Sequence, residues 1–475
     1  MKTPREDPRN PQRKGKPKQA LTLQRTTLRT SRLLDFFSEK ELTAQTGHPK
    51  HEWPLVLLKE LLDNALDAAE DTGIAPEIVV IVDKDGITVS DNGPGIPVDT
   101  VAGILDFGIR VSSREHYASP TRGAQGNALK TIVAMPFVLG GTAGRVDITA
   151  HGVRHEIDIK VDRIKQEPKI EHLQHDDRGV VKRGTCVKVY WPDSSSSILH
   201  AAKQRFLQIA DAFTFLNPHL SLTVDWFGEW RVMKATTLAW PKWLPSNPTC
   251  SHWYTTERLE RLIAGYISHD EAKGRDRTVR EFVGEFAGLT GTAKQKAVLT
   301  ATGLTRMNLS SLRKGDGLDA ALVGVLLKAM QTNSRTVKPS ALGVIGMKHL
   351  EERFQAMGCE METFNYRKVQ GDKNGLPWVI ETAFAATVGA FNQVADADGR
   401  RMISGVNWSP SVSANQFRQL GHESLDSILQ EQRAGDGEPV VIFLHLACPR
   451  VAYTDRGKSA VVISDENTVH DEEDE

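Results

Sequence analysis

Three polar side chains recur at helical spacing in the stretch ELLDNALDAAED, residues 60–71. Glu60, Asn64 and Asp67 stand at i, i+4 and i+7, so they share one face of a helix, with Asp63 beside them. Asn is a mediocre helix former, because its side chain competes for backbone hydrogen bonds. The carboxylate and amide oxygens of such a stripe project from one face, so the stripe could hold a ligand. The alternative is a polar helix face that is simply solvated.

A second candidate is the loop VSDNGPGIP, residues 89–97, which follows an alternating apolar run. Its two glycines and two prolines exclude a helix, and its glycines allow a ligand to approach the backbone closely. Asp91 stands at the mouth of this loop. The pattern therefore predicts a carboxylate beside a glycine-walled pocket, although an ordinary surface turn has the same composition.

A third candidate is TRGAQGNALKTIVAMPF, residues 121–137, in which Gly123 and Gly126 precede an apolar helical pattern. Arg122 and Lys130 flank the glycines. The N-terminus of a helix offers N–H donors and a positive dipole end, which suits a polyphosphate. A plain loop remains the alternative for this segment.

A fourth feature is Gly184 with Thr185 at the start of the strand RGTCVKVYW, which indicates nothing by itself.

The segment AYTDRGKS, residues 452–459, also matches a relaxed phosphate-binding loop. That interpretation requires a following helix within a βαβ unit. The residues that follow instead run from AVVI into an acidic tail, so this interpretation fails on context.

The elements that must position these residues alternate between helical and strand patterns. We expect an α+β sandwich, with helices on one face of a mixed sheet. The predicted helices lie near 54–71, 99–109, 124–135 and 197–213, and the predicted strands near 77–83, 87–91, 144–150, 154–161, 184–191 and 220–226.

A connector rich in Pro and Trp, LAWPKWLPSNPTCSHW, predicts a domain boundary. Residues 254–335 beyond it are mostly helical in pattern, with turns at GLTGTAK, TGLT and RKGDG. Strand patterns return in PWVIETAFAA and EPVVIFLHLACPRVAY, separated by one predicted helix near 413–432.

Composition indicates a globular protein of 475 residues and several domains, because 40% of the residues are apolar. Its four cysteines are far apart, which indicates neither a disulfide framework nor a zinc site. No run of 18 apolar residues and no secretory signal occur, so we expect a soluble, cytoplasmic protein, with association with the nucleoid allowed.

The net charge of −1 conceals a polarised chain. Residues 1–33 carry ten Lys and Arg against two Asp and Glu, whereas residues 465–475 hold seven acids. The basic arm suits a flexible segment that seeks phosphates, but a solvated disordered segment without a partner has the same composition.

In their order and spacing these motifs resemble the GHKL ATPases, which include gyrase, MutL, the large heat-shock chaperones and histidine kinases. The resemblance implies a Bergerat ATPase fold that binds ATP and Mg²⁺. It implies that Glu60 is the general base, that Asn64 is the Mg²⁺ ligand, and that Asp91 accepts from the adenine amino group. The residues implied at the nucleotide are Asn64, Asp67, Asp91, Gly93, Gly95, Ile96, Ser112, Ser113, Arg122, Gly123, Ala124, Gln125, Gly126, Asn127, Ala128, Lys130, Thr185 and Lys458.

Four further segments narrow the resemblance to the B subunit of topoisomerase VI, a type IIB DNA topoisomerase. They are SRLLDFFSEKELTAQTG, VSSREHYASPTRG, LNPHLSLTV and CPRVAYTDRGKSAVV, and with them the resemblance extends over roughly residues 30–462. It implies a basic arm (1–33), a GHKL ATPase domain (34–240), a helix-two-turns-helix-like domain (245–340), a transducer domain of ribosomal S5-like type (341–464) and an acidic tail (465–475). Lys458 would be the catalytic lysine that the transducer places on the γ-phosphate.

This sequence departs from the family's pattern at three places. Ala128 stands where the lid usually has a third glycine, and Arg114 stands where a lysine usually follows the paired serines. The sequence also ends soon after Lys458, so we expect a truncated transducer without its long C-terminal helices.

The resemblance implies an ATP-gated dimeric clamp that acts on double-stranded DNA, with an isomerase activity that needs a winged-helix/Toprim cleavage subunit. The alternative is a stand-alone GHKL ATPase that acts as a nucleotide-switched DNA- or protein-binding module in repair or defence.

Overall fold

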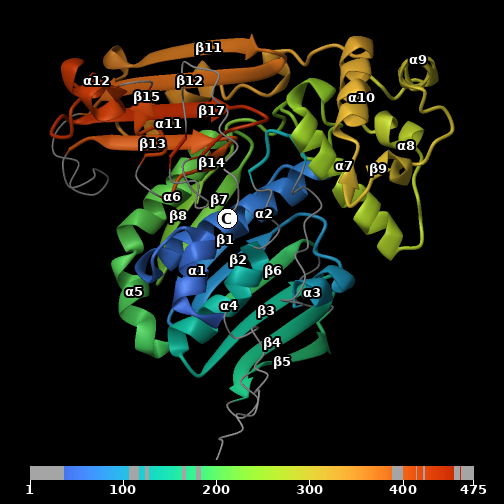
Figure 1. Cartoon of the computed structure of the whole chain (residues 1–475). Helices are drawn as coiled ribbons and strands as arrows, with labels where there is room; N and C mark the ends of the chain where they lie inside the picture. The colour runs from blue at the N-terminus through green and yellow to red at the C-terminus, as the bar shows by residue number, and fades with distance from the viewer. Residues whose placement is uncertain are drawn as a thin grey trace, which may run out of the picture.

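The computed structural model describes residues 37–105, 117–122, 128–162, 167–177, 183–387, 399–412, 415–420, 423–453 and 460–461. Figure 1 shows a large sheet with helices on one face, a helical region to one side and a second sheet above it. Within these ranges no helix has both the length and the apolar character needed to cross a membrane.

The first region is built on an eight-stranded sheet in the order β5-β4-β3-β6-β2-β1-β7-β8. Neighbouring strands are antiparallel except β1 and β7, which are parallel. In β1, EIVVIVD, alternate side chains are buried, as expected for a sheet with one covered face. The strands are β1 (Glu77–Asp83), β2 (Gly86–Asp91), β3 (Ala143–Ala150), β4 (Val153–Asp162), β5 (Glu167–Asp176), β6 (Thr185–Tyr190), β7 (Ser221–Trp226) and β8 (Glu229–Met233).

Helices cover one face of this sheet and form the largest apolar core with it (Figure 1). Leu58, Leu61, Leu62, Ala65 and Ala69 are buried on α2, so its apolar stripe faces the core. The helices are α1 (Glu39–Thr46), α2 (Trp53–Asp71), α3 (Val98–Ile104), α4 (Ala128–Gly140), α5 (Ser196–Ala201) and α6 (Lys203–Leu216).

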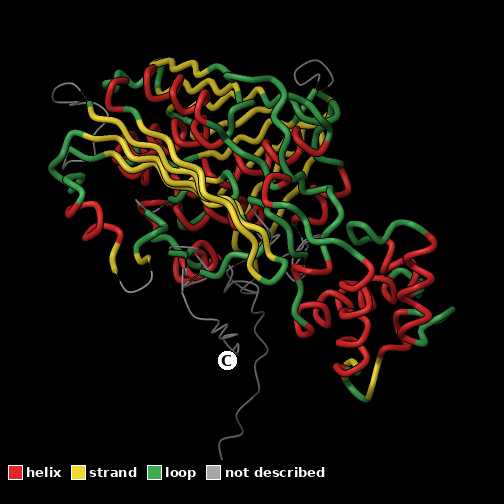
Figure 2. The backbone as a smooth tube through the Cα atoms, turned by 90° about the horizontal axis from the view of Figure 1, so that it is seen from above, coloured by secondary structure: helices red, strands yellow, loops and turns green. Residues whose placement is uncertain are grey.

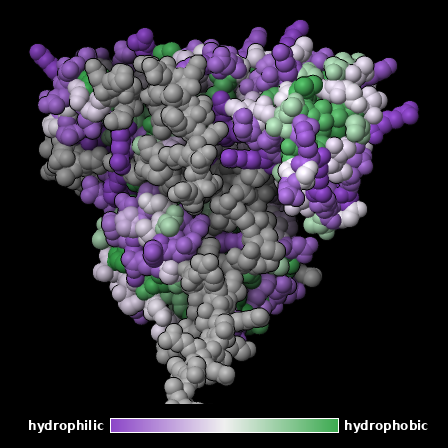
Figure 3. Space-filling model, in the orientation of Figure 1, coloured by the Kyte–Doolittle hydropathy of each residue, from purple (hydrophilic) through white to green (hydrophobic). Residues whose placement is uncertain are grey.

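The second region is helical and forms a lobe of its own in the view from above (Figure 2). It contains α7 (Thr256–Ala272), α8 (Val279–Gly284), α9 (Thr292–Thr302), α10 (Ala320–Asn333) and a hairpin of β9 (Arg313–Lys314) and β10 (Gly317–Leu318). Apolar surface gathers over α10, where Val325 is half exposed (Figure 3).

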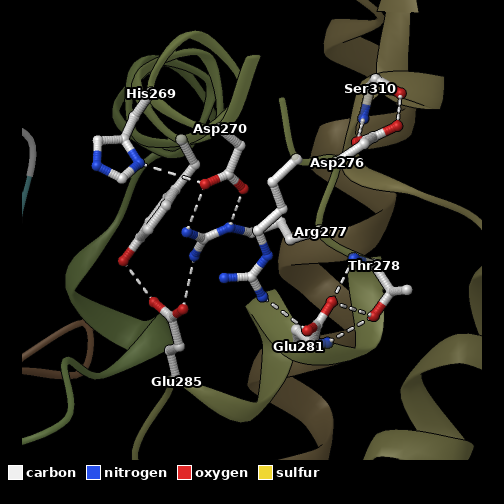
Figure 4. Close-up of polar contacts among 10 residues, drawn as sticks. His269, Asp270, Asp276, Arg277, Thr278, Glu281, Glu285 and Ser310 are labelled. Carbon is white, nitrogen blue, oxygen red and sulfur yellow. Dashed lines mark hydrogen bonds and ion pairs between the residues drawn. The ribbon is translucent and has the colours of Figure 1, made fainter. Parts of the chain in front are cut away.

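A buried ion network holds the start of α8 against the end of α7 (Figure 4). The Arg277 Nε and Nη2 donate to the two carboxylate oxygens of Asp270 at 2.5 and 3.1 Å, and its Nη1 donates to Glu285 at 2.7 Å. The hydrogen bonds from Arg277 lower the pKa of Asp270 to about 2. Thr278 and Glu281 form a capping box at the start of α8, which fixes where this helix begins.

The third region is a five-stranded sheet in the order β11-β12-β17-β13-β14. Its buried face shares a core with the end of α6, so α6 packs against both sheets. Its elements are α11 (Met347–Ala356), β11 (Asn365–Lys373), β12 (Leu376–Ala386), β13 (Arg401–Val406), β14 (Ser409–Pro410), β15 (Gln419–Leu420), β16 (Glu423–Ser424), α12 (Leu425–Glu431) and β17 (Val440–Ala447).

The predicted helix near 413–432 is wrong over most of its length. Residues 419–420 and 423–424 pair as β15 and β16, and among the residues of this range that the structure describes only Leu425–Glu431 are helical. The Ser424 side chain caps this short helix by accepting from the Ser427 N–H at 3.1 Å. The predicted helix at 197–213 is instead two helices, α5 and α6. The structure also contains three elements that were not predicted, namely α1, β5 and β8.

Candidate functional site

The polar face of α2 divides between solvent and the protein interior. The side chain of Asn64 is exposed and that of Glu60 is 29% exposed. Asp63 is buried instead, where its Oδ2 accepts from Lys59 Nζ and from the Ser409 hydroxyl, both at 2.8 Å. Asp63 therefore connects α2 to the five-stranded sheet, whereas Glu60 and Asn64 remain accessible.

The loop after β2 is organised by the Asp91 side chain. Its Oδ1 accepts from the backbone N–H groups of Gly93, at 2.8 Å, and Thr185, at 3.2 Å. Burial raises the pKa of Asp91, and these two hydrogen bonds partly oppose that effect. The carboxylate is thus fixed in position at a half-buried point between β2 and β6.

Thr185 holds the far end of the same loop. Its hydroxyl oxygen accepts from the Ile96 N–H at 3.2 Å, while its own N–H donates to Asp91. The predicted residues Asp91, Gly93, Ile96 and Thr185 therefore form one hydrogen-bonded unit.

The glycines of this unit stand where side chains would clash. A Cβ on Gly184, at φ +87°, would lie 1.8 Å from the Asp91 carbonyl oxygen. A Cβ on Gly95, at φ +90°, would lie 3.1 Å from the Gly184 carbonyl oxygen. A Cβ on Gly93 would lie 3.6 Å from the Ala69 nitrogen, so the loop runs along the last turns of α2. The helix and the glycine loop, predicted separately, are therefore brought together.

Arg122 is in the protein interior. Its Nη1 donates to Asp67 Oδ1 at 2.8 Å and to Glu70 Oε2 at 2.7 Å, and its Nη2 donates to Glu70 Oε1 at 2.6 Å. Its guanidinium is fully buried. Arg122 and Asp67 thus join α2 to the segment that leads into residues 123–127, and their contact with a nucleotide stays a prediction.

Ala128 begins α4, where it is partly exposed, and Lys130 is buried in the first turn of the same helix. The other residues predicted at the lid and the catalytic lysine lie outside the described residues; they are Ser112, Ser113, Gly123, Ala124, Gln125, Gly126, Asn127 and Lys458.

Sequence reasoning missed three residues next to the site. Asn217, His219 and Lys242 surround Arg122 and Glu70, and all three are buried. Asn217 and His219 belong to the segment LNPHL, and Lys242 belongs to the connector WPKW. The available signals were the two polar residues that flank Pro218 and the lysine between Pro241 and Trp243.

The described residues contain no group of three or more His, Cys, Asp or Glu side chains that could hold a metal ion. Mg²⁺ usually binds through one or two protein oxygens together with phosphates, rather than in an all-protein cage. The exposed amide of Asn64 fits such a partial donor set.

Residues 52–195 match the family described as histidine kinase-, DNA gyrase B- and HSP90-like ATPase. This match covers α2, the Asp91 loop and β6, so the chain carries an ATPase domain of the GHKL class, as predicted from its motifs.

Individual relatives give a more specific comparison than this ATPase class. The chain is similar to the B subunit of type 2 DNA topoisomerase 6 from Natronomonas pharaonis, with 36% identity over 24% of this chain and 15% of the relative. The corresponding protein of Archaeoglobus fulgidus is 29% identical over 36% of this chain and 28% of the relative. That of Metallosphaera sedula is 24% identical over 85% of this chain and 74% of its own length. The chain covers less than a third of the length of the first two relatives. These similarities confirm the predicted resemblance to this family of subunits.

Two solved structures also align with the chain. One is the N-terminal domain of a DNA repair protein, with a TM-score of 0.36 and 11% identity over 86% of this chain and 87% of that chain. The other is the Aquifex aeolicus MutL ATPase domain complexed with ADP, with a TM-score of 0.32 and 12% identity over 82% and 89% of the two chains.

Proposed function

We propose that this chain is the ATP-binding and ATP-hydrolysing subunit of a type IIB topoisomerase-like complex. The observation that carries the proposal is the approach of the Asp91 loop to the last turns of α2, the helix that also bears Glu60 and Asn64. The similarity to the B subunit of topoisomerase 6 across 85% of the chain supports the assignment beyond the ATPase domain.

Each accessible polar group has a distinct role in this proposal. Asp91 accepts from the adenine amino group, and Gly93 and Gly95 leave room for the base. Glu60 orients the attacking water and accepts its proton. Asn64 holds Mg²⁺, which supplies charge neutralisation for the phosphates when it is bound. Residues 123–127 close over the phosphates, and Lys458 contacts the γ-phosphate.

At the level of assembly, two copies associate when ATP binds and form a clamp on double-stranded DNA. A separate winged-helix/Toprim subunit supplies strand cleavage. ATP can drive closure only if its γ-phosphate makes different contacts in the open and closed arrangements. Residues 1–33 add a basic, salt-dependent contact with DNA.

The first test is Glu60→Ala in the full chain. We expect retained binding of a non-hydrolysable ATP analogue and a loss of turnover of about 100-fold or more, because a positioned base contributes about that much. The matched control is Glu77→Ala, which removes an exposed carboxylate at the start of β1. Hydrolysis by Glu60→Ala near the wild-type rate would remove Glu60 from the mechanism.

A second test separates the assemblies. The chain, reconstituted with a winged-helix/Toprim subunit from the same source, should relax supercoiled DNA when ATP is present. DNA-stimulated ATPase without relaxation would instead support the stand-alone, nucleotide-switched module.

A further inference from the structure

The last turn of α2 ends in a buried cluster of charged side chains, here called the Glu70 cluster: Glu70, Arg122, Lys242 and His219. Lys242 Nζ lies 2.6 Å from Glu70 Oε2, and His219 Nε2 lies 3.0 Å from Glu70 Oε1. The side chains of Glu70 and Lys242 are each 2% exposed. One carboxylate therefore contacts two buried cations and an imidazole.

The second cation is not required to neutralise Glu70. Arg122 already donates to both Glu70 oxygens, which is the strongest arrangement for an Arg–carboxylate pair. Burial and the neighbouring Arg122 lower the pKa of Lys242 to about 8. A buried lysine held in this way costs stability, so its presence calls for a reason other than stability.

Lys242 is in contact with the five-stranded sheet on its other side. Its Nζ lies 4.0 Å from the centre of the Trp408 ring, and the Trp408 carbonyl accepts from Asn217 Nδ2 at 2.9 Å. Trp408 and Asn407, between β13 and β14, have φ values of +65° and +49°. A buried Trp in the left-handed region is unusual and persists only where its surroundings enforce it.

The contacts form a continuous route. The turn at Asn407 and Trp408 contacts Lys242, Lys242 contacts Glu70, and Glu70 holds Arg122. Arg122 is the last described residue before residues 123–127, which the proposed function assigns to the phosphates. The five-stranded sheet is therefore connected, through side-chain contacts, to the residue that precedes this segment.

We propose that Lys242 is a positioning residue for the nucleotide site. Lys242 shares Glu70 with Arg122 and so determines how firmly Arg122 is held against α2. The turn at Trp408 fixes Lys242 and thereby connects the hold on Arg122 to the five-stranded sheet. This inference rests on the proposed ATPase function. It assigns Lys242 no contact with ATP.

The charge state of Lys242 gives a direct test. The charged groups that face it are Glu70 and Asp67 from α2 and Arg122 from residues 117–122, with His219 beside them. From the connector and from the β13–β14 turn, Lys242 faces the aromatic rings of Trp240 and Trp408. When Lys242 loses its proton, Arg122 becomes the sole charged partner of Glu70 and is held more firmly.

The experiment measures kcat and KM for ATP from about pH 6.5 to 9.5 for the full chain and its Lys242→Met and Lys242→Arg variants. In the wild type we expect KM to change about fivefold through pH 8, a typical coupling magnitude. Lys242→Met should keep the high-pH value throughout, and Lys242→Arg the low-pH value. The matched control is Lys188→Met, because Lys188 also lies over an aromatic ring, Tyr190, but is more exposed.

A wild-type chain that hydrolyses ATP without a KM step, or a step that persists in Lys242→Met, would overturn the positioning role and leave the proposed function intact. Urea unfolding gives a readout independent of ATP. The pKa of Lys242 falls from 10.5 to about 8 on folding, so the wild type should gain stability relative to Lys242→Met as the pH rises from 8 to 10.5. The absence of this gain would also overturn the proposal, whereas failure to bind ATP would identify the proposed function as the error.

Discussion

Gly184→Ala is the most direct test of the geometry that fixes Asp91. Gly184 has φ +87°, and an added Cβ would lie 1.8 Å from the Asp91 carbonyl oxygen and 2.6 Å from the carbonyl carbon. These are backbone atoms of the neighbouring strand, so no side-chain rotation relieves the clash.

The cost has two parts. The left-handed backbone costs alanine about 1–2 kcal/mol. Forcing the strands apart adds about 1–3 kcal/mol, the usual penalty for overpacking. We therefore expect Gly184→Ala to lower the free energy of unfolding by about 2–5 kcal/mol.

The chain offers a matched control in Gly228→Ala. Gly228 has φ +89°, but a Cβ there would meet no atom within 4 Å. This variant bears the backbone cost alone, about 1–2 kcal/mol. The difference between the two variants in urea unfolding thus isolates the close approach of Gly184 to Asp91.

Binding of an ATP analogue, measured by calorimetry, completes the test. Gly184→Ala should weaken binding, because the Asp91 carboxylate moves with its backbone, whereas Gly228→Ala should not. Equal unfolding midpoints for the two variants would refute the close approach. A destabilised Gly184→Ala variant with unchanged affinity would show that the position of Asp91 does not matter for binding.

Four further predictions follow from the remaining contacts and charges. Asn64→Ala should abolish Mg²⁺-dependent nucleotide binding, and unchanged affinity in calorimetry would exclude the ligand role. Because burial raises the pKa of Asp91 above 3.8, nucleotide affinity should fall on acidification before an ordinary aspartate would protonate, and Asp91→Asn should remove this dependence. Arg277→Met leaves Asp270 buried without its partner, so we expect a loss of about 3–5 kcal/mol in urea unfolding. The Asp270 pKa of about 2 lies below the ordinary 3.8, so its stabilisation should fade in the wild type as the pH drops from about 4 to 2, and a similar fade in Arg277→Met would refute the pairing. Deletion of residues 1–33 should flatten the salt dependence of DNA binding, and an unaltered slope would assign this arm another role.

Elements with a strong burial pattern were predictable from sequence, and elements at sheet edges were not. β1 and α2 match the predicted ranges closely, because alternation and an apolar stripe report burial on one side. β5 and β8 end the eight-stranded sheet on either side, and their side chains are mostly exposed or half exposed. Without a buried face they carry no alternating signal.

The wrong helix near 413–432 has a similar physical reason. Its polar and apolar residues fit a helical period, but Phe417 is buried in a core with the five-stranded sheet, and residues 415–418 are non-helical. Packing against a distant strand overrode the local pattern. Ser424, an N-cap residue, was the local sign of the true start.

The helical period of α2 correctly predicted which residues share a face, but it could not predict the partner of each. Asp67 shares the polar stripe of Glu60 and Asn64, yet its carboxylate accepts from Arg122. Partners of this kind are far apart in sequence, and only the fold brings them together.

Helix α2 presents a different acidic group to each of its neighbours. Glu60 is partly exposed and is the proposed base, Asp63 accepts from Ser409 of the five-stranded sheet, and Glu70 contacts Arg122 and Lys242. A small displacement of α2 would therefore move all three carboxylates together. A ligand shifts such an element only if the ligand's own contacts differ between the element's positions, and the contacts of α2 with Ser409 and, through Glu70, with Lys242 would carry such a shift to the five-stranded sheet. Coupling between ATP and the five-stranded sheet thus requires no contact with the nucleotide from the sheet, provided that α2 moves as a unit.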